Sequence, residues 1–280
     1  MNVRDLFDTE FPVVGMVHLQ PLPGSPGATR IESVRQQAIA DGRALEGGGV
    51  DAILVENFGD APFYPNEVPK HTVASMTRIA TELRNEVSVP VGINVLRNDV
   101  EAALAVAAAV GGEFVRANVH AGVRATDQGI VEGRAHETIR RRRQLDADVA
   151  VFADVDVKHS TPVSPEYDPL MALEDVVVRG LADAVVASGT ATGQPTSPSL
   201  VRKLSRAARE TKRNPPVFVG SGVTPDTVED YVDVADGAIV GSAFKPDGDP
   251  GAPVDGSRVQ QLVDSVRTAT GESRHARDES

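Results

Sequence analysis

The chain has 280 residues, of which 41% are hydrophobic and 24% are charged, a balance typical of a globular protein with a sizeable core. With 28 basic and 40 acidic residues its formal net charge is −12, which argues against a surface for nucleic acid or anionic membrane. The absence of cysteine excludes disulfides, iron–sulfur clusters, thiolate zinc sites and cysteine nucleophiles.

The termini and the apolar runs indicate where the protein resides. No apolar run approaches the roughly 20 residues of a membrane span, and the first five residues lack the pattern of a signal peptide. We therefore expect a soluble, cytoplasmic protein. The basic residues are five lysines and 23 arginines. An acidic, lysine-poor surface helps proteins stay soluble in strong salt, so a halophilic protein is a further hypothesis.

Eight short apolar runs, rich in β-branched residues, recur along the chain. Because each is nearly continuous in apolar character, they predict strands buried on both faces of a parallel sheet. The runs are Val13–Val17, Ala52–Val55, Val91–Val95, Phe114–Val119, Val149–Val155, Ala184–Ala187, Val217–Val219 and Ala238–Val240.

Amphipathic or alanine-rich segments follow these runs and predict helices. They are Ile31–Glu46, Thr72–Glu86, Asp99–Val110, Ala135–Leu145, Leu170–Leu181, Ser199–Lys212, Pro225–Val232 and Arg258–Thr268. Eight strand–helix units of about 32 residues predict a (β/α)8 TIM barrel. We expect a single domain over residues 1–280, with a core from about 11 to 270 and a polar tail at 271–280. A doubly wound sheet is less favoured, because no G-x-G-x-x-G turn follows the first strand.

Ionisable groups gather at the ends of the second to fifth predicted strands, where a TIM barrel places its active site. We predict four catalytic groups: Glu56, Asp154, Asp156 and Lys158. Alternation would place the last three on one side of their strand. Lys158 could form a Schiff base, act as a general acid or clamp a phosphate; the structural alternative is an ion pair with either aspartate.

Further polar residues lie at or near strand ends and are predicted to bind substrate: His18, Asn57, Asn94, Arg116 and Asn118. His18 could equally be a satisfied core histidine, and Arg97 could equally form a surface ion pair with Asp99. A divalent metal held by carboxylates and an imidazole is a minority interpretation, because no zinc-type spacing is present. Its ligands would come from Glu56, Asp154, Asp156 and His159.

Small residues follow the last three predicted strands. Glycines allow backbone N–H groups to approach an anion, hydroxyls add donors, and barrels often bind phosphate in the loops after strands seven and eight. We predict a phosphate site at Ser188, Gly189, Gly220, Ser221, Gly222, Gly241 and Ser242. The alternative is that these residues form ordinary tight turns.

Six blocks of sequence resemble the BtpA family: 15–26, 55–63, 94–99, 152–160, 219–224 and 239–245. The resemblance extends from about Val13 to Val263. It implies a barrel similar to the ribulose-phosphate-binding barrels, such as phosphoribosylanthranilate isomerase. It also implies a link to photosystem I biogenesis for the cyanobacterial member, and to sugar-utilisation genes for others. The resemblance assigns no catalytic residue.

These observations predict an enzyme acting on a phosphorylated sugar, nucleotide or similar small metabolite, by isomerase, lyase or glycosyl-type acid–base chemistry. The alternative is an assembly or stability factor for a membrane complex, without catalysis. A ligand-binding regulator is a third interpretation. The expected partner is a small phosphorylated metabolite, with no nucleic acid and no integral membrane segment, and a homo-oligomer remains open.

Overall fold

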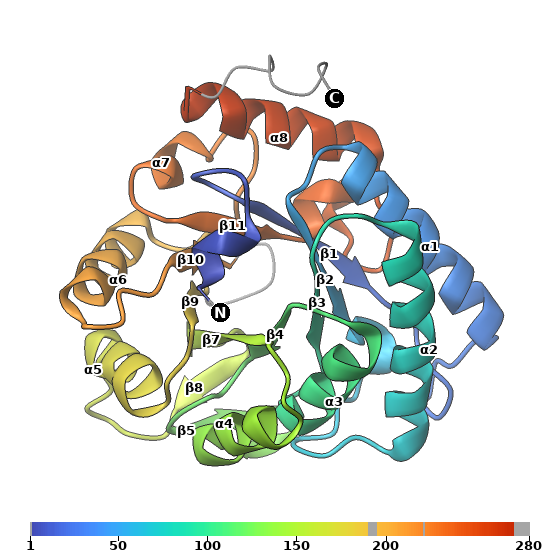
Figure 1. Ribbon diagram of the computed structural model, residues 1–280, viewed down its shortest axis with the longest axis horizontal. Helices are drawn as coiled ribbons and strands as arrows, with labels where there is room; N and C mark the ends of the chain where they lie inside the picture. The colour runs from blue at the N-terminus through green and yellow to red at the C-terminus, as the bar shows by residue number, and fades with distance from the viewer. Residues whose placement is uncertain (1, 190–194, 221, 272–280) are drawn as a thin grey trace.

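Eight parallel strands close into a barrel in the order β1-β11-β10-β9-β7-β4-β3-β2 (Figure 1). The computed structural model describes residues 2–189, 195–220 and 222–271. The barrel strands are β1 (Val13–His18), β2 (Ala52–Glu56), β3 (Val91–Asn94), β4 (Phe114–Ala117), β7 (Ala150–Asp156), β9 (Ala184–Ala187), β10 (Val217–Val219) and β11 (Gly237–Val240). Each strand matches a predicted run to within two residues, so the predicted (β/α)8 fold is confirmed.

The helices form a ring outside the barrel (Figure 1). They are α1 (Ile31–Gly47), α2 (Lys70–Glu86), α3 (Val100–Val110), α4 (Ala135–Gln144), α5 (Pro169–Glu174), α6 (Pro198–Glu210), α7 (Glu229–Val232) and α8 (Gly256–Ala269). A π-helical turn, Asp175–Arg179, continues α5, and α7 is shorter than predicted. Asp99 caps α3 by accepting a hydrogen bond from the amide of Ala102 at 2.9 Å, as expected of an N-cap aspartate.

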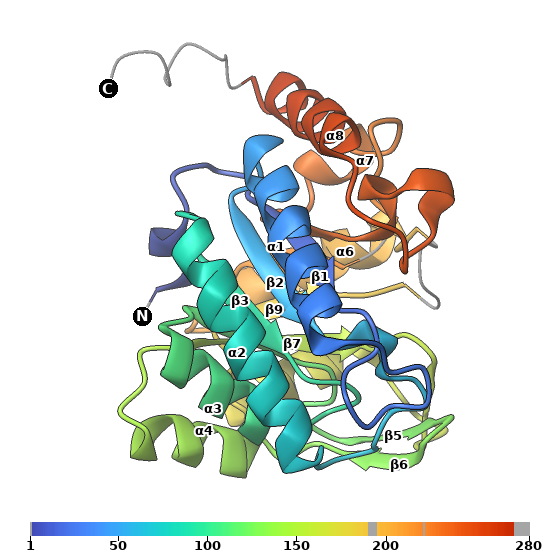
Figure 2. The same ribbon diagram turned by 90° about the vertical axis from the view of Figure 1, so that its right-hand side faces the viewer.

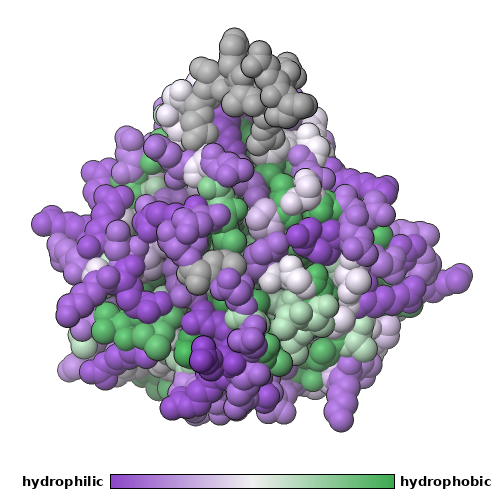
Figure 3. Space-filling view, viewed as in Figure 1, coloured by the Kyte–Doolittle hydropathy of each residue, from purple (hydrophilic) through white to green (hydrophobic). Residues whose placement is uncertain are grey.

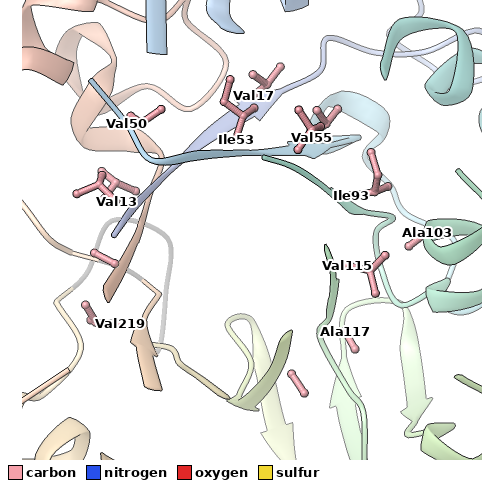
Figure 4. Close-up of a cluster of buried hydrophobic side chains, with 14 of the residues drawn as sticks. Val13, Val17, Val50, Ile53, Val55, Ile93, Ala103, Val115, Ala117 and Val219 are labelled. Carbon is pink, nitrogen blue, oxygen red and sulfur yellow. The ribbon is translucent and has the colours of Figure 1, made fainter. Parts of the chain in front are cut away.

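Two buried layers explain why the strands are apolar throughout. Side chains facing outward, such as Val17, Ile53 and Val115, pack against the helices (Figure 4). Side chains facing inward fill the barrel, where the Phe152 ring lies 4.8 Å from Phe114 and 5.0 Å from Phe218 between centroids. A strand buried on both faces has no polar alternation to show, which is the pattern of the eight runs.

The N-terminal segment closes one end of the barrel. A 3-10 helix, Val3–Leu6, brings Val3 and Leu6 against the interior cluster, and the ring of Phe7 lies 6.0 Å from that of Phe218. Residues before 11, the expected start of the core, therefore add to it. The cavity that opens into the barrel lies at the opposite end, where the barrel strands terminate.

A small antiparallel sheet at that opposite end was not predicted. It consists of β5 (Val123–Thr126), β6 (Gly129–Glu132) and β8 (Ser160–Pro162), in the order β6-β5-β8. In Figure 2 it lies at the lower right, away from the N-terminus. Two of its strands are inserted between β4 and α4, and the third follows β7. The insertion builds a wall beside the mouth of the barrel.

The outer surface is largely hydrophilic on the face in Figure 3, with apolar patches between the charged groups. Within the described ranges, none of the helices has the length and apolar character that crossing a membrane would require.

Candidate active site at the carboxyl end of the barrel

Polar side chains replace apolar ones at the last inward-facing position of most barrel strands. Above the apolar floor, His18, Glu56, Asn94, Arg116 and Asp154 enter the barrel from five strands. A cavity of about 740 Å³ opens over them. The residues named in the sequence analysis that line it are His18, Glu56, Arg97, Arg116, Asn118, Lys158, His159, Gly220, Gly222, Gly241 and Ser242. Both predicted clusters thus contribute to one cavity.

Arg116 and Asp154 form a two-pronged ion pair on adjacent strands β4 and β7. Arg116 Nε and Nη2 each donate to a different carboxylate oxygen of Asp154, both at 2.8 Å. Burial disfavours the charged guanidinium, but the adjacent Asp154 carboxylate outweighs this and raises the pKa of Arg116. Ser188 Oγ lies 3.4 Å from Asp154 Oδ2, and Asn118 Nδ2 also lies 3.4 Å from it. The Asp154 side chain is fully buried and does not line the cavity, so its geometry is that of a counter-ion that positions Arg116.

Asp156 does not share a side of its strand with Asp154, so that prediction is wrong. A β-bulge lies between the two: Asp154 pairs with Val186, whose side chain is in the barrel interior, while Asp156 pairs with Ala187, which packs toward the helices. Such a bulge adds a residue to one strand and re-aims the following side chains. Asp156 instead accepts from Arg124 Nη2 of β5 at 2.9 Å and is not among the residues lining the cavity.

Lys158 follows the bulge and lines the cavity. Lys158 forms neither of the ion pairs considered for it, because the Asp154 carboxylate is paired with Arg116 and the Asp156 carboxylate is paired with Arg124. Among the described residues, no hydrogen bond or ion pair involves the Lys158 amine. Burial, followed by the positive charge of Arg116, lowers the pKa of Lys158 to about 8.

His18, Glu56 and Asn94 form a second group on β1, β2 and β3. Asn94 Nδ2 donates to Glu56 Oε2 at 2.6 Å, and His18 Nε2 lies 4.0 Å from Glu56 Oε1. Burial, and then the positive charge of Lys245, lower the pKa of His18 to about 3. The neutral ring therefore donates from Nδ1 to the carbonyl of Pro250, 3.0 Å away, and leaves Nε2 as an acceptor. His18 also stacks on Phe58, with centroids 4.6 Å apart.

Two of the predicted residues hold the loops around the site. Asn57 is buried, accepts from the amide of Leu96 at 2.7 Å and donates to Asp60 at 3.0 Å. Ser188 is buried in the contacts of Arg116 and Asp154. Neither residue is part of the lining of the main cavity, nor is Gly189. Their predicted binding roles stay predictions, and the geometry favours supporting ones.

The loops after β10 and β11 line the cavity with small residues and backbone: Gly220, Gly222, Val223, Thr224, Gly241, Ser242 and Ala243. No hydrogen bond within the described ranges uses the amides of Gly222, Val223, Ser242 or Ala243. Gly222 has φ +77°, and a Cβ on Gly241 would come within 3.0 Å of the His18 ring. Four residues of the cavity lining therefore have amides without a partner in the described part of the chain, and such amides are available to an anion. Ser221 lies outside the described residues.

Two basic residues near the site were not predicted as functional. Arg97 is buried rather than paired with Asp99 on the surface; it lines the cavity and donates to Gln128 at 3.0 Å. Lys245 is 1% exposed and donates to the same Pro250 carbonyl as His18, at 2.6 Å. The β6–β5 hairpin supplies Gln128, and the loop before α8 supplies Pro250, so only the tertiary structure reveals these contacts.

The side chains proposed as metal ligands do not assemble. Within the described part of the chain, no three histidine, aspartate or glutamate side chains are placed to hold one ion. Asp154 and Asp156 face different arginines, so the four-residue ligand set that the sequence suggested does not fit a metal.

Comparison with solved structures shows the fold. Thiamine phosphate pyrophosphorylase from Pyrococcus furiosus superposes with a TM-score of 0.55 at 17% identity, over 93% of this chain and 97% of that one. N-(5′-phosphoribosyl)anthranilate isomerase from the same organism gives a TM-score of 0.56 at 14% identity, over 92% and 99% of the two chains. These likenesses confirm the (β/α)8 architecture that the family resemblance implied.

Comparison of sequences shows the family. The chain is 44% identical over 267 residues to the photosystem I biogenesis protein BtpA of Synechocystis sp., covering 95% of this chain and 91% of the relative. It is 47% identical over 257 residues to the uncharacterized protein TK2179 of Thermococcus kodakarensis, covering 91% and 95%. The model of the BtpA family matches residues 9–268. The chain belongs to the BtpA family.

Proposed function

We propose that the protein is an enzyme that acts on a small phosphorylated metabolite bound in the cavity at the carboxyl end of the barrel. The phosphate would rest between the loops after β10 and β11. The observation that supports this most strongly is the group of amides on those loops, from Gly222, Val223, Ser242 and Ala243, that no hydrogen bond among the described residues uses. Backbone N–H groups that converge on a cavity are suited to phosphate oxygens.

Other side chains at the mouth of the barrel offer groups for the reacting part of the substrate. Glu56 is the acid–base group, oriented by Asn94, and His18 Nε2 is an acceptor beside it. The Oδ1 atom of Asn118, which lines the cavity, is buried without a partner in the described structure, which suits a substrate hydroxyl or amine donor; the Oδ1 atom of Asn94 is also unpartnered, but Asn94 does not line the cavity. Arg116, fixed by Asp154, supplies a positive charge to the same cavity.

The names of the structural neighbours are consistent with this proposal. Thiamine phosphate pyrophosphorylase and phosphoribosylanthranilate isomerase are both named for phosphorylated compounds. Because fold likeness does not fix function, these names support the class of ligand and leave the reaction open.

The alternative function is assembly of a membrane complex, favoured by the name of the Synechocystis relative. It requires no ligand in the cavity. Ligand binding in the cavity therefore separates the two candidates.

The test is a thermal-shift screen of phosphorylated sugars and nucleotides, each paired with its dephosphorylated counterpart. The proposal predicts that at least one phosphorylated compound raises the melting temperature by about 5 °C at roughly 100 times its Kd, while its counterpart does not. The loops after β10 and β11 that would hold the phosphate are called the phosphate cradle below. The variant Ser242→Glu adds a carboxylate to this cradle and should abolish the shift. The matched control Ser33→Glu, on the exposed surface of α1, should retain it. Equal shifts for both members of each pair, or none at all, would reject the proposal.

A further inference from the structure

The Lys158 amine is in an unusual position for a cation, because its side chain is half-buried and no carboxylate pairs with it in the described structure. Buried charges in proteins are ordinarily paired. Here the two carboxylates nearest in sequence are already used: Asp154 is held by two hydrogen bonds from Arg116, and Asp156 is held by Arg124. The amine lines the cavity and has no hydrogen-bond partner in the described structure.

The other lysines provide a comparison. Lys70, Lys203 and Lys212 are exposed on the helical side of the molecule. Lys245 is more deeply buried than the half-buried Lys158, but it donates to the carbonyl of Pro250 at 2.6 Å and does not line the cavity. Lys158 is thus the one lysine of the described chain whose amine faces the cavity without a partner.

An amine placed in this way is suited to attack rather than to charge pairing. A lysine that clamps a phosphate must stay protonated, whereas burial and the positive charge of Arg116 both favour the neutral form of Lys158, whose pKa falls to about 8. The neutral amine is the nucleophile that adds to a carbonyl carbon. A desolvated position next to another cationic group is a known way to prepare such a lysine.

We propose that Lys158 forms a covalent imine with the substrate, and that the substrate is therefore a phosphorylated aldehyde or ketone. This inference rests on the proposed function, because the phosphate cradle would hold the compound while its carbonyl meets the amine. Both the amine and the loops of the cradle line the same cavity.

The step balances without another reactant. Nζ adds to the carbonyl carbon, and the C=O π pair moves to oxygen, giving a carbinolamine. The C–O bond then breaks, and the oxygen leaves as water with two of the three protons of the ammonium group. The remaining proton and the positive charge stay on the iminium nitrogen. Glu56, on the wall of the same cavity, is available to relay these protons.

The experiment traps the imine in the full-length protein. The protein is incubated at about pH 7.5 with dihydroxyacetone phosphate and sodium borohydride, which reduces an iminium to a stable secondary amine, and is then digested and analysed by mass spectrometry. With only five lysines, each site can be quantified separately. We expect the modified fraction of Lys158 to exceed that of each other lysine at least about ten-fold, because exposed amines are mostly protonated at this pH.

Three controls test whether labelling depends on the phosphate group, on Lys158 and on deprotonation of its amine. Dihydroxyacetone should label Lys158 much less, because it lacks the phosphate. The variant Lys158→Met should lose the adduct at this position, while the other lysines keep their background labelling. Trapping by the wild-type protein should rise with pH through about 8, following the amine.

The outcomes separate this inference from the proposed function. If dihydroxyacetone phosphate or another phosphorylated carbonyl compound shifts the melting temperature but no lysine is trapped selectively, the imine is wrong and the phosphate site stands. If Lys158 is labelled equally with and without the phosphate, the amine is reactive and the phosphate site is wrong. Labelling spread over the exposed lysines would overturn the inference.

Discussion

Replacing Lys158 by methionine should stabilise the folded protein at neutral pH. Methionine keeps an unbranched chain in the same place, while the buried charge is removed. In the fold, the pKa of Lys158 is lowered from 10.5 to about 8. Each pKa unit corresponds to about 1.4 kcal/mol, so the protonated amine lowers the free energy of unfolding by at most about 3.4 kcal/mol. Partial exposure and relaxation reduce this, and we expect Lys158→Met to gain about 2 kcal/mol.

The pH dependence distinguishes this gain from better packing. Below about pH 8 the amine is protonated in both states, so the folded state bears the full penalty. Between about pH 8 and 10.5 the unfolded chain binds a proton that the folded chain has lost, so wild-type stability rises with pH relative to the variant. The advantage of the variant should disappear toward pH 10.5.

The assay is urea unfolding of the two proteins at pH 7 and at pH 10, followed by circular dichroism. Lys203→Met, at an exposed site on α6, is the matched control and should change the free energy of unfolding by less than about 0.5 kcal/mol. A variant that is less stable than wild type at pH 7, or a gain that is independent of pH, would refute the description of Lys158 as an unpartnered, half-buried cation.

Three further predictions concern the interior of the barrel. Asp154→Asn should cost about 3–5 kcal/mol in urea unfolding, because Arg116 is left buried without its counter-ion; a cost below about 1 kcal/mol would contradict the pair. Since the pKa of His18 is lowered to about 3, the unfolded chain takes up a proton between about pH 6.5 and 3 that the folded chain does not, so the free energy of unfolding decreases as the pH is lowered through this range, by up to about 1.4 kcal/mol per pH unit; His18→Asn should remove that part of the decrease, and an unchanged acid profile would argue against it. Gly92→Ala should cost about 1–3 kcal/mol in the same assay, because its Cβ would lie 2.2 Å from the Phe114 ring, and a neutral substitution would mean that the floor of the barrel is loosely packed.

The fold was predictable because its main signal is local. Each barrel strand carries side chains that point into the barrel, such as Met16 and Phe114, and side chains that point out to the helices, such as Ile53 and Val115. Both faces are therefore apolar, and each strand appears in the sequence as a short continuous apolar run. The polar residues at the run ends, such as Glu56, were visible for the same reason, since they interrupt otherwise apolar segments.

The site was predictable only in part because its decisive contacts are not local. A strict two-residue alternation predicts that Asp156 joins Asp154, and only the bulge, which depends on pairing with β9, separates them. Arg124, which pairs with Asp156, comes from a small sheet whose strands of three or four residues leave too short a pattern to recognise. The partner shared by His18 and Lys245 is a backbone carbonyl, at Pro250, and a sequence pattern carries no signal for such a contact.

The most direct test of the phosphate cradle is a crystal structure of the protein grown with inorganic phosphate. We expect phosphate oxygens within about 3 Å of the amides of Gly222 or Val223 on one side and of Ser242 or Ala243 on the other. The Ser242→Glu protein should show no phosphate there under the same conditions. Phosphate bound elsewhere on the wild-type protein, with the cradle holding only water, would contradict the proposal that these loops bind a phosphorylated metabolite.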